Sequence, residues 1–369
     1  MLAALRKTDY TLVLSLIPLL VAGLITMKTL GGGNDYFFDR QLIWVVASFA
    51  IFLLAGMVDW SFLKNGAILF SFYLLGVVGL ATLFILGKTV KGAASWIDFS
   101  FFSLEPAEPM KIILILVLAK YFARRHVAIA HVKHILVSGV YALLPATLVL
   151  FQPDLGSAVI FAFIWLGMVL VSGISKKHLF FVFLVSLLIF LIGWQFVLQP
   201  YQKARIMTFI HPLADVRGAG YNAYQSMLAV GSGQILGKGI GFGTQSRLSF
   251  LPEHETDFIF AAFAEEWGFV GVLFLFLFFG IVVWRVLKIS FIGGSNFERL
   301  FSMGLAILIF TQIFINIGMN IGLLPITGIT LPFMSYGGSA LFSLFIGLGI
   351  LTGMAGSVRM YDREPHIVG

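Results

Sequence analysis

Residues 250–285 read FLPEHETDFIFAAFAEEWGFVGVLFLFLFFGIVVWR, a group of acids followed by an apolar run long enough to cross a membrane. Ionisable groups are costly in a bilayer, at roughly 2.5 to 3.5 kcal/mol near its centre on insertion scales. Acids at this junction therefore indicate water, a cation or a reaction beside them. Asp257, which directly precedes the apolar run, is the first candidate for a functional residue.

The composition around this stretch is that of a membrane protein. The chain is 59% hydrophobic and 11% charged, which excludes an ordinary soluble domain and an outer-membrane barrel of alternating polarity. Runs of roughly 17 to 25 apolar residues suffice to span a bilayer as helices. The sequence therefore predicts an all-α polytopic integral membrane protein with about ten spans, at 10–29, 42–58, 65–87, 109–123, 134–151, 157–174, 178–198, 258–285, 300–321 and 338–357.

Charge placement predicts the orientation of the spans. The first run is too long for a signal peptide and has no small-residue cleavage site, so it is interpreted as the first transmembrane helix. Basic residues concentrate in alternate loops, which the positive-inside rule assigns to the cytoplasm together with both termini. These residues are Arg6, Lys7, Arg124, Arg125, Lys176, Lys177, Arg285 and Lys288. The loops 88–108, 152–156 and 199–257 are then extracytoplasmic.

No linker or internal repeat divides the chain, so residues 1–369 are predicted to form one membrane domain with 199–257 as a large loop within it. Loops longer than about 12 to 15 residues are usually functional or disordered. The net charge of +7 fits the topological bias and contact with anionic membrane lipids, and no nucleic-acid partner is expected. The absence of cysteine excludes disulfides and thiol chemistry.

Several polar constellations have both a functional and a structural interpretation. The alternating glycines of residues 237–243, GKGIGFG, could cradle a phosphate or only permit tight turns. Glu108 and Lys111 lie three apart on one helical face, which suits either a structural ion pair or contact with substrate. Gln312, Asn316 and Asn320 recur every four residues, most simply as hydrogen-bonding contacts between helices.

Four separate motifs resemble the SEDS (shape, elongation, division and sporulation) family. They are GYNAYQSMLAVGSGQILGKGIGFGTQSRLSFLPEHETDFIFAAFAEEWGFVG at 220–271, QPDLGSA at 152–158, GAASWIDF at 92–99 and LLPITGITLPFMSYGGSAL at 323–341. The likeness spans nearly the whole chain. Compact length and short tails resemble the rod-shape branch most, with the division and sporulation branches as close competitors.

The resemblance implies a peptidoglycan glycosyltransferase of the bacterial cytoplasmic membrane that polymerises lipid II into glycan on the outer side. It also implies a class B penicillin-binding protein as partner. The family's catalytic aspartate corresponds to Asp257, its important tryptophan to Trp96, and its glutamate and lysine to Glu108 and Lys111. This chain departs from the family pattern at Glu105 and Ala107. The predicted substrate-binding set is Trp96, Glu108, Lys111, Asp154, Lys203, Arg205, Gln245, Ser246, Arg247 and Glu253.

Two roles for Asp257 stay open at the level of sequence. It could accept the proton of an attacking sugar hydroxyl, or it could position a divalent cation, Mg or Mn, beside a leaving pyrophosphate. No other cofactor is expected. Two other classes of protein are also compatible with this composition: a flippase or transporter of lipid-linked precursors, and a non-catalytic scaffold of the wall-synthesis complex.

Overall fold

The computed structural model describes residues 9–30, 35–90, 93–98, 103–124, 132–196, 198–211, 220–248, 250–292 and 294–361. Each of the ten predicted spans is a helix in this structure. The helices are α2 Tyr10–Leu30, α3 Tyr36–Met57, α4 Gly66–Leu86, α5 Ala107–Ala123, α6 Val132–Phe151, α7 Leu155–Val171, α8 Lys176–Phe196, α12 Ile259–Ile292, α13 Asn296–Asn320 and α14 Gly338–Tyr361. Within the described residues, eight are long and apolar enough to cross a membrane, and α5 and α7 have 17 residues each.

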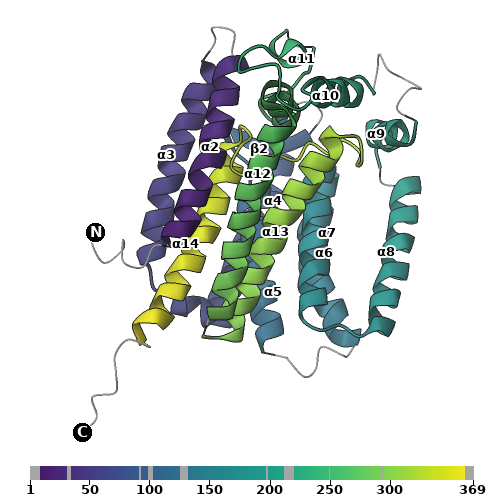
Figure 1. Ribbon diagram of the computed structural model, residues 1–369. Coiled ribbons are helices and arrows are strands. Elements are labelled where there is room, and N and C mark those ends of the chain that lie inside the picture. Colours follow the sequence, from purple (N-terminus) through teal and green to yellow (C-terminus); the bar gives the residue numbers. More distant parts are fainter. Residues whose placement is uncertain are drawn as a thin grey trace.

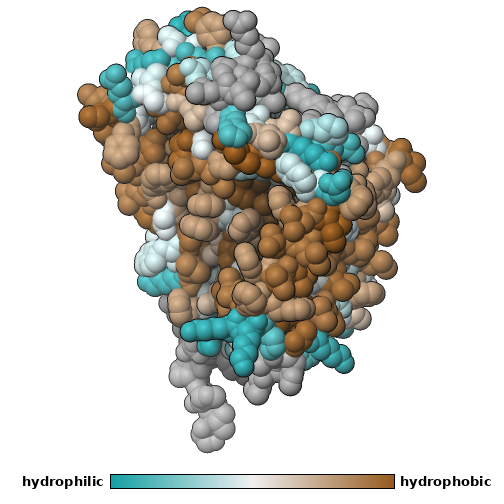
Figure 2. Space-filling view, turned by 90° about the vertical axis from the view of Figure 1, so that its right-hand side faces the viewer, coloured by the Kyte–Doolittle hydropathy of each residue, from teal (hydrophilic) through white to brown (hydrophobic). Residues whose placement is uncertain are grey.

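The helices form a bundle with α13 near its middle (Figure 1). α13 packs against α5, α7 and α12, while α14 packs against α3. The degree of burial differs widely: 72% of the α13 span is buried, compared with 6% of the α8 span, which stands at one edge of the bundle. Helices that are apolar on every face are stable here because lipid solvates their outer sides. A broad hydrophobic belt accordingly separates the hydrophilic ends of the molecule (Figure 2).

The predicted extracytoplasmic loops contain regular structure of their own. The segment 88–108 forms three short antiparallel strands in the order β1 Lys88–Val90, β2 Ala93–Asp98, β3 Ser103–Leu104, with Lys88 opposite Trp96. The segment 199–257 contains α9 Pro200–Ile210, α10 Tyr221–Ser232 and α11 Thr244–Arg247. A short 3-10 helix, η1 Trp60–Lys64, precedes α4. The strands and α9 to α11 gather at one end of the bundle (Figure 1).

The eighth predicted span is one helix in the sequence pattern but is interrupted in the structure. Gly268 interrupts α12 with φ 64° and ψ −168°, a conformation open essentially to glycine alone. The chain beyond the break bonds to the loop after α10: Phe269 N donates to Gln234 O at 2.9 Å, and Val270 N to Ile235 O at 3.1 Å. A Cβ atom on Gly268 would lie 2.2 Å from Gly237 N. The break therefore joins α12 to the segment that follows α10.

Replacing Gly268 with alanine is expected to lower the free energy of unfolding by about 3 kcal/mol or more, because positive φ and a backbone overlap both oppose the methyl group. Gly280→Ala, on the same helix with nothing within 4 Å of its added Cβ, is the matched control and is expected to leave stability unchanged or slightly raised. Thermal unfolding of both variants in detergent measures the difference. Equal midpoints for the two variants would contradict this account of the break.

Candidate active site

A polar cavity of about 550 Å³ lies at the end of the bundle that carries the strands and α10. Its lining comes from segments far apart in the sequence: the strand region, the starts of α5 and α7, α9, α10, and the loops before α12 and α14. Seven ionisable side chains take part in this lining: Glu105, Glu108, Lys111, Asp154, Arg205, Glu253 and Asp257. Such convergence of titratable groups in a concave site is typical of catalysis.

Asp257 lies in the last turn before α12, and its peptide group is held from both sides. Its backbone oxygen accepts hydrogen bonds from Asn316 Nδ2 at 3.0 Å and Asn320 Nδ2 at 3.1 Å, both on α13. Its backbone N donates to Glu253 O at 3.1 Å. Asn316 Nδ2 also donates to Ile329 O at 2.7 Å, which joins the turn to the loop before α14. The polar stripe of α13 therefore connects helices, as predicted, and also positions Asp257.

The loop before α14 fixes the same turn from another direction. Ser335 Oγ donates to Thr256 O at 2.6 Å and accepts a hydrogen bond from Leu331 N at 2.7 Å. Gly328 has φ 75°, and a Cβ atom there would lie 3.6 Å from Asp257 Oδ2. The carboxylate of Asp257 thus approaches bare backbone on one side, within a site whose geometry is set before any substrate arrives.

Glu108 and Lys111 form the predicted ion pair at the start of α5. Lys111 Nζ donates to Glu108 Oε1 at 2.7 Å, and both side chains are almost fully buried. A buried charge requires such a partner, because an uncompensated one would carry its full desolvation cost. Both residues also line the cavity, so the structural ion pair is observed and is compatible with the predicted contact with substrate.

Glu105 is a cavity residue that the sequence analysis noted only as a departure from the family pattern. Burial raises the pKa of its carboxyl well above the ordinary value, and the negative charges of Glu108, Asp154 and Asp257 add to this effect while Lys111 opposes it. The raised pKa favours the proton-bearing form of this carboxyl, in which a glutamate offers a hydrogen-bond donor as a glutamine amide would.

The other predicted residues divide into two groups. Trp96, Asp154, Arg205 and Glu253 line the cavity, and Asp154 additionally caps α7 by accepting a hydrogen bond from Ser157 N at 3.0 Å. Lys203, Gln245, Ser246 and Arg247 are absent from its lining. Lys203 Nζ lies 6.0 Å from the centre of the Trp194 ring, and Arg247 donates to Gly241 O at 3.2 Å.

The glycine-rich loop and the residues that follow it surround the carboxylate of Glu265, an anion that is part of the protein. Glu265 is fully buried and accepts hydrogen bonds from the backbone N of Thr244, Gln245 and Ser246 at 2.8, 3.0 and 3.1 Å. Lys238 Nζ pairs with the same carboxylate at 2.8 Å. Close packing and positive φ at three of the loop's glycines follow from this wrapping. The phosphate interpretation of the loop is replaced by an internal carboxylate cradle.

The neighbouring acid has a second, separate set of partners. Glu266 accepts a hydrogen bond from Gly241 N at 2.9 Å and from Thr29 Oγ1 at 3.0 Å, which ties the loop to α2. Glu265 and Glu266 therefore point to different partners, as their adjacency on a helix predicts, and neither lines the cavity. Their role is to hold the loop against the bundle.

No group of three or more His, Asp or Glu side chains in the described ranges is placed to hold a metal ion. His254 is occupied by protein groups: its Nδ1 lies 2.7 Å from Leu251 O and its Nε2 lies 3.1 Å from Glu255 Oε1. Burial alone would lower the pKa of His254, but the hydrogen bond and charge of Glu255 raise it overall. These contacts give this histidine a structural role in the turn before α12.

Some cavity residues were not predicted, among them Asn222, Thr256 and Thr330. Each is an ordinary polar residue in a loop or at a helix start, which no local pattern distinguishes from solvent-exposed loop. For Thr330 the available signal was the motif LLPITGITLPFMSYGGSAL, which contains it.

Fold and site together define a polytopic helical membrane protein with an acid-lined polar cavity at one end. Residues 3–360 match the family model FTSW_RODA_SPOVE, described as cell cycle protein, and the chain belongs to this family. Peptidoglycan glycosyltransferase MrdB of Escherichia coli K12 is 36% identical over 96% of this chain and 95% of its own length. Stage V sporulation protein E of Bacillus subtilis is 34% identical, over 97% and 99% respectively.

Solved structures agree with this assignment. A chain from a peptidoglycan synthase complex, described as coordinating polymerisation and crosslinking, superposes with a TM-score of 0.80 at 28% identity, covering 95% of this chain and 98% of that one. The rod shape determining protein RodA of Thermus thermophilus gives a TM-score of 0.70 at 25% identity, with 97% and 98% covered. The membership in the SEDS family implied by the motifs is confirmed.

Breaking the Glu108–Lys111 pair is expected to be strongly destabilising. Glu108→Ala or Lys111→Ala alone leaves one buried charge without its partner and should cost about 3 to 5 kcal/mol of unfolding free energy. The double variant Glu108→Ala/Lys111→Ala removes both charges and should cost less than the sum of the two single variants. Unfolding in detergent tests the cycle, and additive costs would show that the pair does not act as a unit.

Replacing Glu105 with glutamine is expected to change the pH dependence of stability. The folded-state pKa lies above the unfolded value of about 4.3, so the stability associated with this carboxyl is complete below that value and is lost as pH rises toward the folded pKa. Between the unfolded and the folded pKa, the unfolding free energy of wild type falls relative to that of Glu105→Gln by up to about 1.4 kcal/mol per pH unit. The two proteins should have the same unfolding midpoint near pH 4, and the midpoint of the variant should be the higher one at neutral pH. Parallel curves would rule out a buried neutral carboxyl.

Proposed function

We propose that the chain polymerises lipid II in the cavity around Asp257. The chain is a peptidoglycan glycosyltransferase: its family, and the identity of 36% to MrdB over nearly the full length of both proteins, establish the activity. The observation that carries the assignment to this cavity is the carboxylate of Asp257 in its lining, on a turn that Asn316 and Asn320 hold from α13.

The reaction needs one base. A β-1,4 bond forms when the acceptor's 4-hydroxyl oxygen attacks the anomeric carbon of an α-linked sugar pyrophosphate, the bond to the pyrophosphate breaks, and the configuration inverts. Asp257 accepts the hydroxyl proton, a contribution typically worth 10² to 10⁴ in rate. Undecaprenyl pyrophosphate leaves with the bonding electrons. Fixed geometry of the turn supports this role, because a positioned base contributes only when it lies within hydrogen-bond reach of the acceptor.

The leaving pyrophosphate requires positive charge, and two cavity cations are placed to supply it. Lys111 and Arg205 line the same cavity as Asp257, whereas Lys203 and Arg247 lie outside it. An Arg guanidinium can bind phosphate oxygens through two parallel hydrogen bonds, and an ammonium acts as a point charge. We assign pyrophosphate binding to these two residues and contact with the sugars to Trp96 and Glu253.

A divalent cation, Mg or Mn, fits this site if it binds together with the pyrophosphate of the substrate. Mg²⁺ is usually held by one or two carboxylates together with substrate phosphates, and so does not require a cluster of protein ligands. Asp257 and Glu253 are cavity carboxylates able to contribute such contacts. When bound, the ion would neutralise charge that develops on the pyrophosphate.

The orientation follows from charge. Arg285, Lys288, Lys176 and Lys177 lie at the ends of α12 and α8 remote from the cavity, since each helix runs between the two ends of the bundle (Figure 1). Basic residues mark the cytoplasmic side of membrane proteins. We therefore propose that both termini are cytoplasmic and that the cavity faces outward from the bacterial cytoplasmic membrane.

A class B penicillin-binding protein is the proposed partner, because the similar chain in the solved peptidoglycan synthase complex belongs to an assembly that couples polymerisation to crosslinking. Polymerised glycan is the substrate that such a transpeptidase needs. We further propose that the chain serves cell elongation and shape, in line with its 36% identity to MrdB over nearly the full length of both proteins.

Asp257→Asn is expected to reduce polymerisation of purified lipid II by 10² or more with an unchanged unfolding midpoint, because the amide keeps the shape of the carboxylate and cannot accept the proton. Asp39→Asn, an exposed acid in the first turn of α3, is the matched control and should retain full activity. The assay uses the full chain with its transpeptidase, with and without EDTA.

Chelation should abolish product, and Mg or Mn should restore it, if the ion accompanies the pyrophosphate. Full activity of Asp257→Asn would exclude this residue as the base. Full activity of wild type in EDTA would exclude the cation and leave Lys111 and Arg205 as the charges that meet the leaving group.

A further inference from the structure

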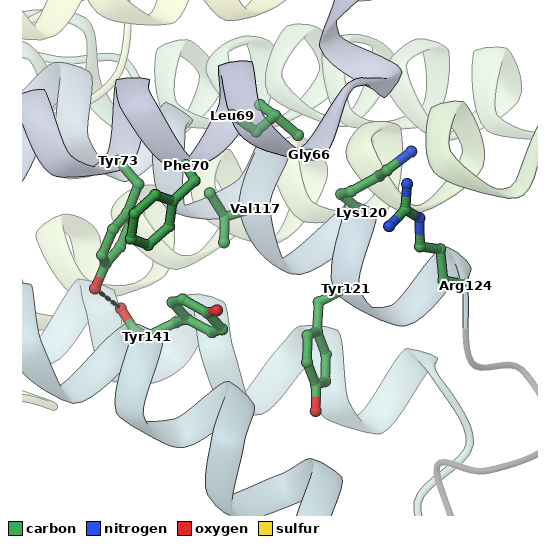
Figure 3. A pocket seen from close by; sticks show the side chains of 9 residues that line it. All are labelled: Gly66, Leu69, Phe70, Tyr73, Val117, Lys120, Tyr121, Arg124 and Tyr141. Carbon is green, nitrogen blue, oxygen red and sulfur yellow. Dashed lines mark hydrogen bonds between the residues drawn. The ribbon is translucent and has the colours of Figure 1, made fainter.

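A second cavity, of about 150 Å³, lies between α4, α5 and α6, toward the end of the bundle remote from the active site (Figure 3). α5 connects the two cavities: its first turn carries Glu108 and Lys111, and its last turn carries Lys120. Arg124 follows directly after the helix, about 24 Å from Glu108 at 1.5 Å per residue. The second cavity therefore faces the opposite leaflet from the catalytic one.

Two cations stand together at one side of this cavity. Lys120 and Arg124 are four residues apart, and Figure 3 shows their charged ends close to each other. Among the described residues, no ion pair joins either of them to a carboxylate, while the neighbouring cation Lys64 is paired with Glu298 at 3.0 Å. Like charges at this spacing repel each other, so the arrangement favours an anion from outside the protein.

Aromatic rings form the rest of the wall. Tyr73 Oη donates to Tyr141 O at 2.9 Å, and Tyr121 Oη lies 3.0 Å from His134 Nδ1, so both hydroxyls already have partners. The rings present apolar surface to the cavity (Figure 3). Phe70, at the edge of the cavity, is 55% exposed on a helix of which only 22% of the span is buried. This edge therefore opens toward lipid.

We propose that this cavity binds the headgroup phosphate of an anionic glycerophospholipid from the leaflet opposite the active site, with an acyl chain along the Phe70 face of α4. Lys120 and Arg124 meet the phosphate, and the tyrosines occupy the interfacial depth where such rings are most stable. A soluble phosphate would pair with the two cations but would make no contact with the apolar wall of the cavity. A zwitterionic lipid would contact the apolar wall but would not carry the net negative charge that complements the two cations.

The test compares lipid binding to the delipidated full chain in detergent, read as the shift of the unfolding midpoint on titration with phosphatidylglycerol. Lys120→Gln/Arg124→Gln should bind phosphatidylglycerol roughly tenfold or more weakly than wild type, because each cation near an anionic headgroup is worth about fivefold in affinity. Lys176→Gln/Lys177→Gln is the matched control, an exposed basic pair at the same end of the bundle, and should bind like wild type.

Gly66→Leu provides a variant that keeps both charges. Gly66 lines the cavity at the start of α4, and the nearest atom to its added Cβ is Arg124 Nη1 at 4.0 Å, so a leucine can enter the space without backbone strain. It should fill the cavity and weaken binding as the charge variant does. An unchanged phosphatidylglycerol shift in both variants would overturn the proposal. An equal shift with inorganic phosphate, or with phosphatidylcholine of the same chains, would also overturn it.

Discussion

Two amide side chains on α13 hold the backbone oxygen of Asp257, and the site depends on this contact. That oxygen would otherwise face the interior of a membrane protein, where an unpaired backbone group is costly. Asn316 and Asn320 satisfy it from α13, and their own remaining groups are used by Ala261 N, Ser226 Oγ and the loop before α14. The requirement that buried polar groups be paired thus positions Asp257 and connects α10 and α12 to α13.

The arrangement of helices could be predicted from the sequence because apolar length alone specifies a membrane span. All ten predicted runs are helices. The break at Gly268 could not be predicted, since the apolar pattern continues through it and its cause is a contact with Gly237, some thirty residues earlier. The three strands of 88–108 were missed for a similar reason: their pairing depends on tertiary contacts rather than on a long alternating pattern.

The predicted residues that line the cavity are mainly those that had a costly environment to explain. Asp257 and the pair Glu108–Lys111 stood at the ends of apolar helices, and the structure brings them to one cavity. Predictions for Gln245, Ser246 and Arg247 rested on position in a long loop, and there the loop wraps Glu265 instead. A carboxylate buried without substrate is the anion that satisfies those amides. The amides that bind this anion follow the glycine-rich loop rather than belong to it, so the glycine pattern did not locate them.

The charges of the catalytic cavity explain why its chemistry needs more than the residues that line it. Five acids and two cations lie in the described lining, which is an excess of negative charge where a pyrophosphate must bind. Pairing with Lys111 offsets the charge of Glu108, and the raised pKa of Glu105 reduces its share of the negative charge. Asp154, Glu253 and Asp257 leave an excess of negative charge over Arg205 in this lining. On the proposal that Asp257 is the base, a divalent cation that arrives with the substrate would relieve this excess, so the proton-accepting and cation-positioning roles proposed for Asp257 would be complementary.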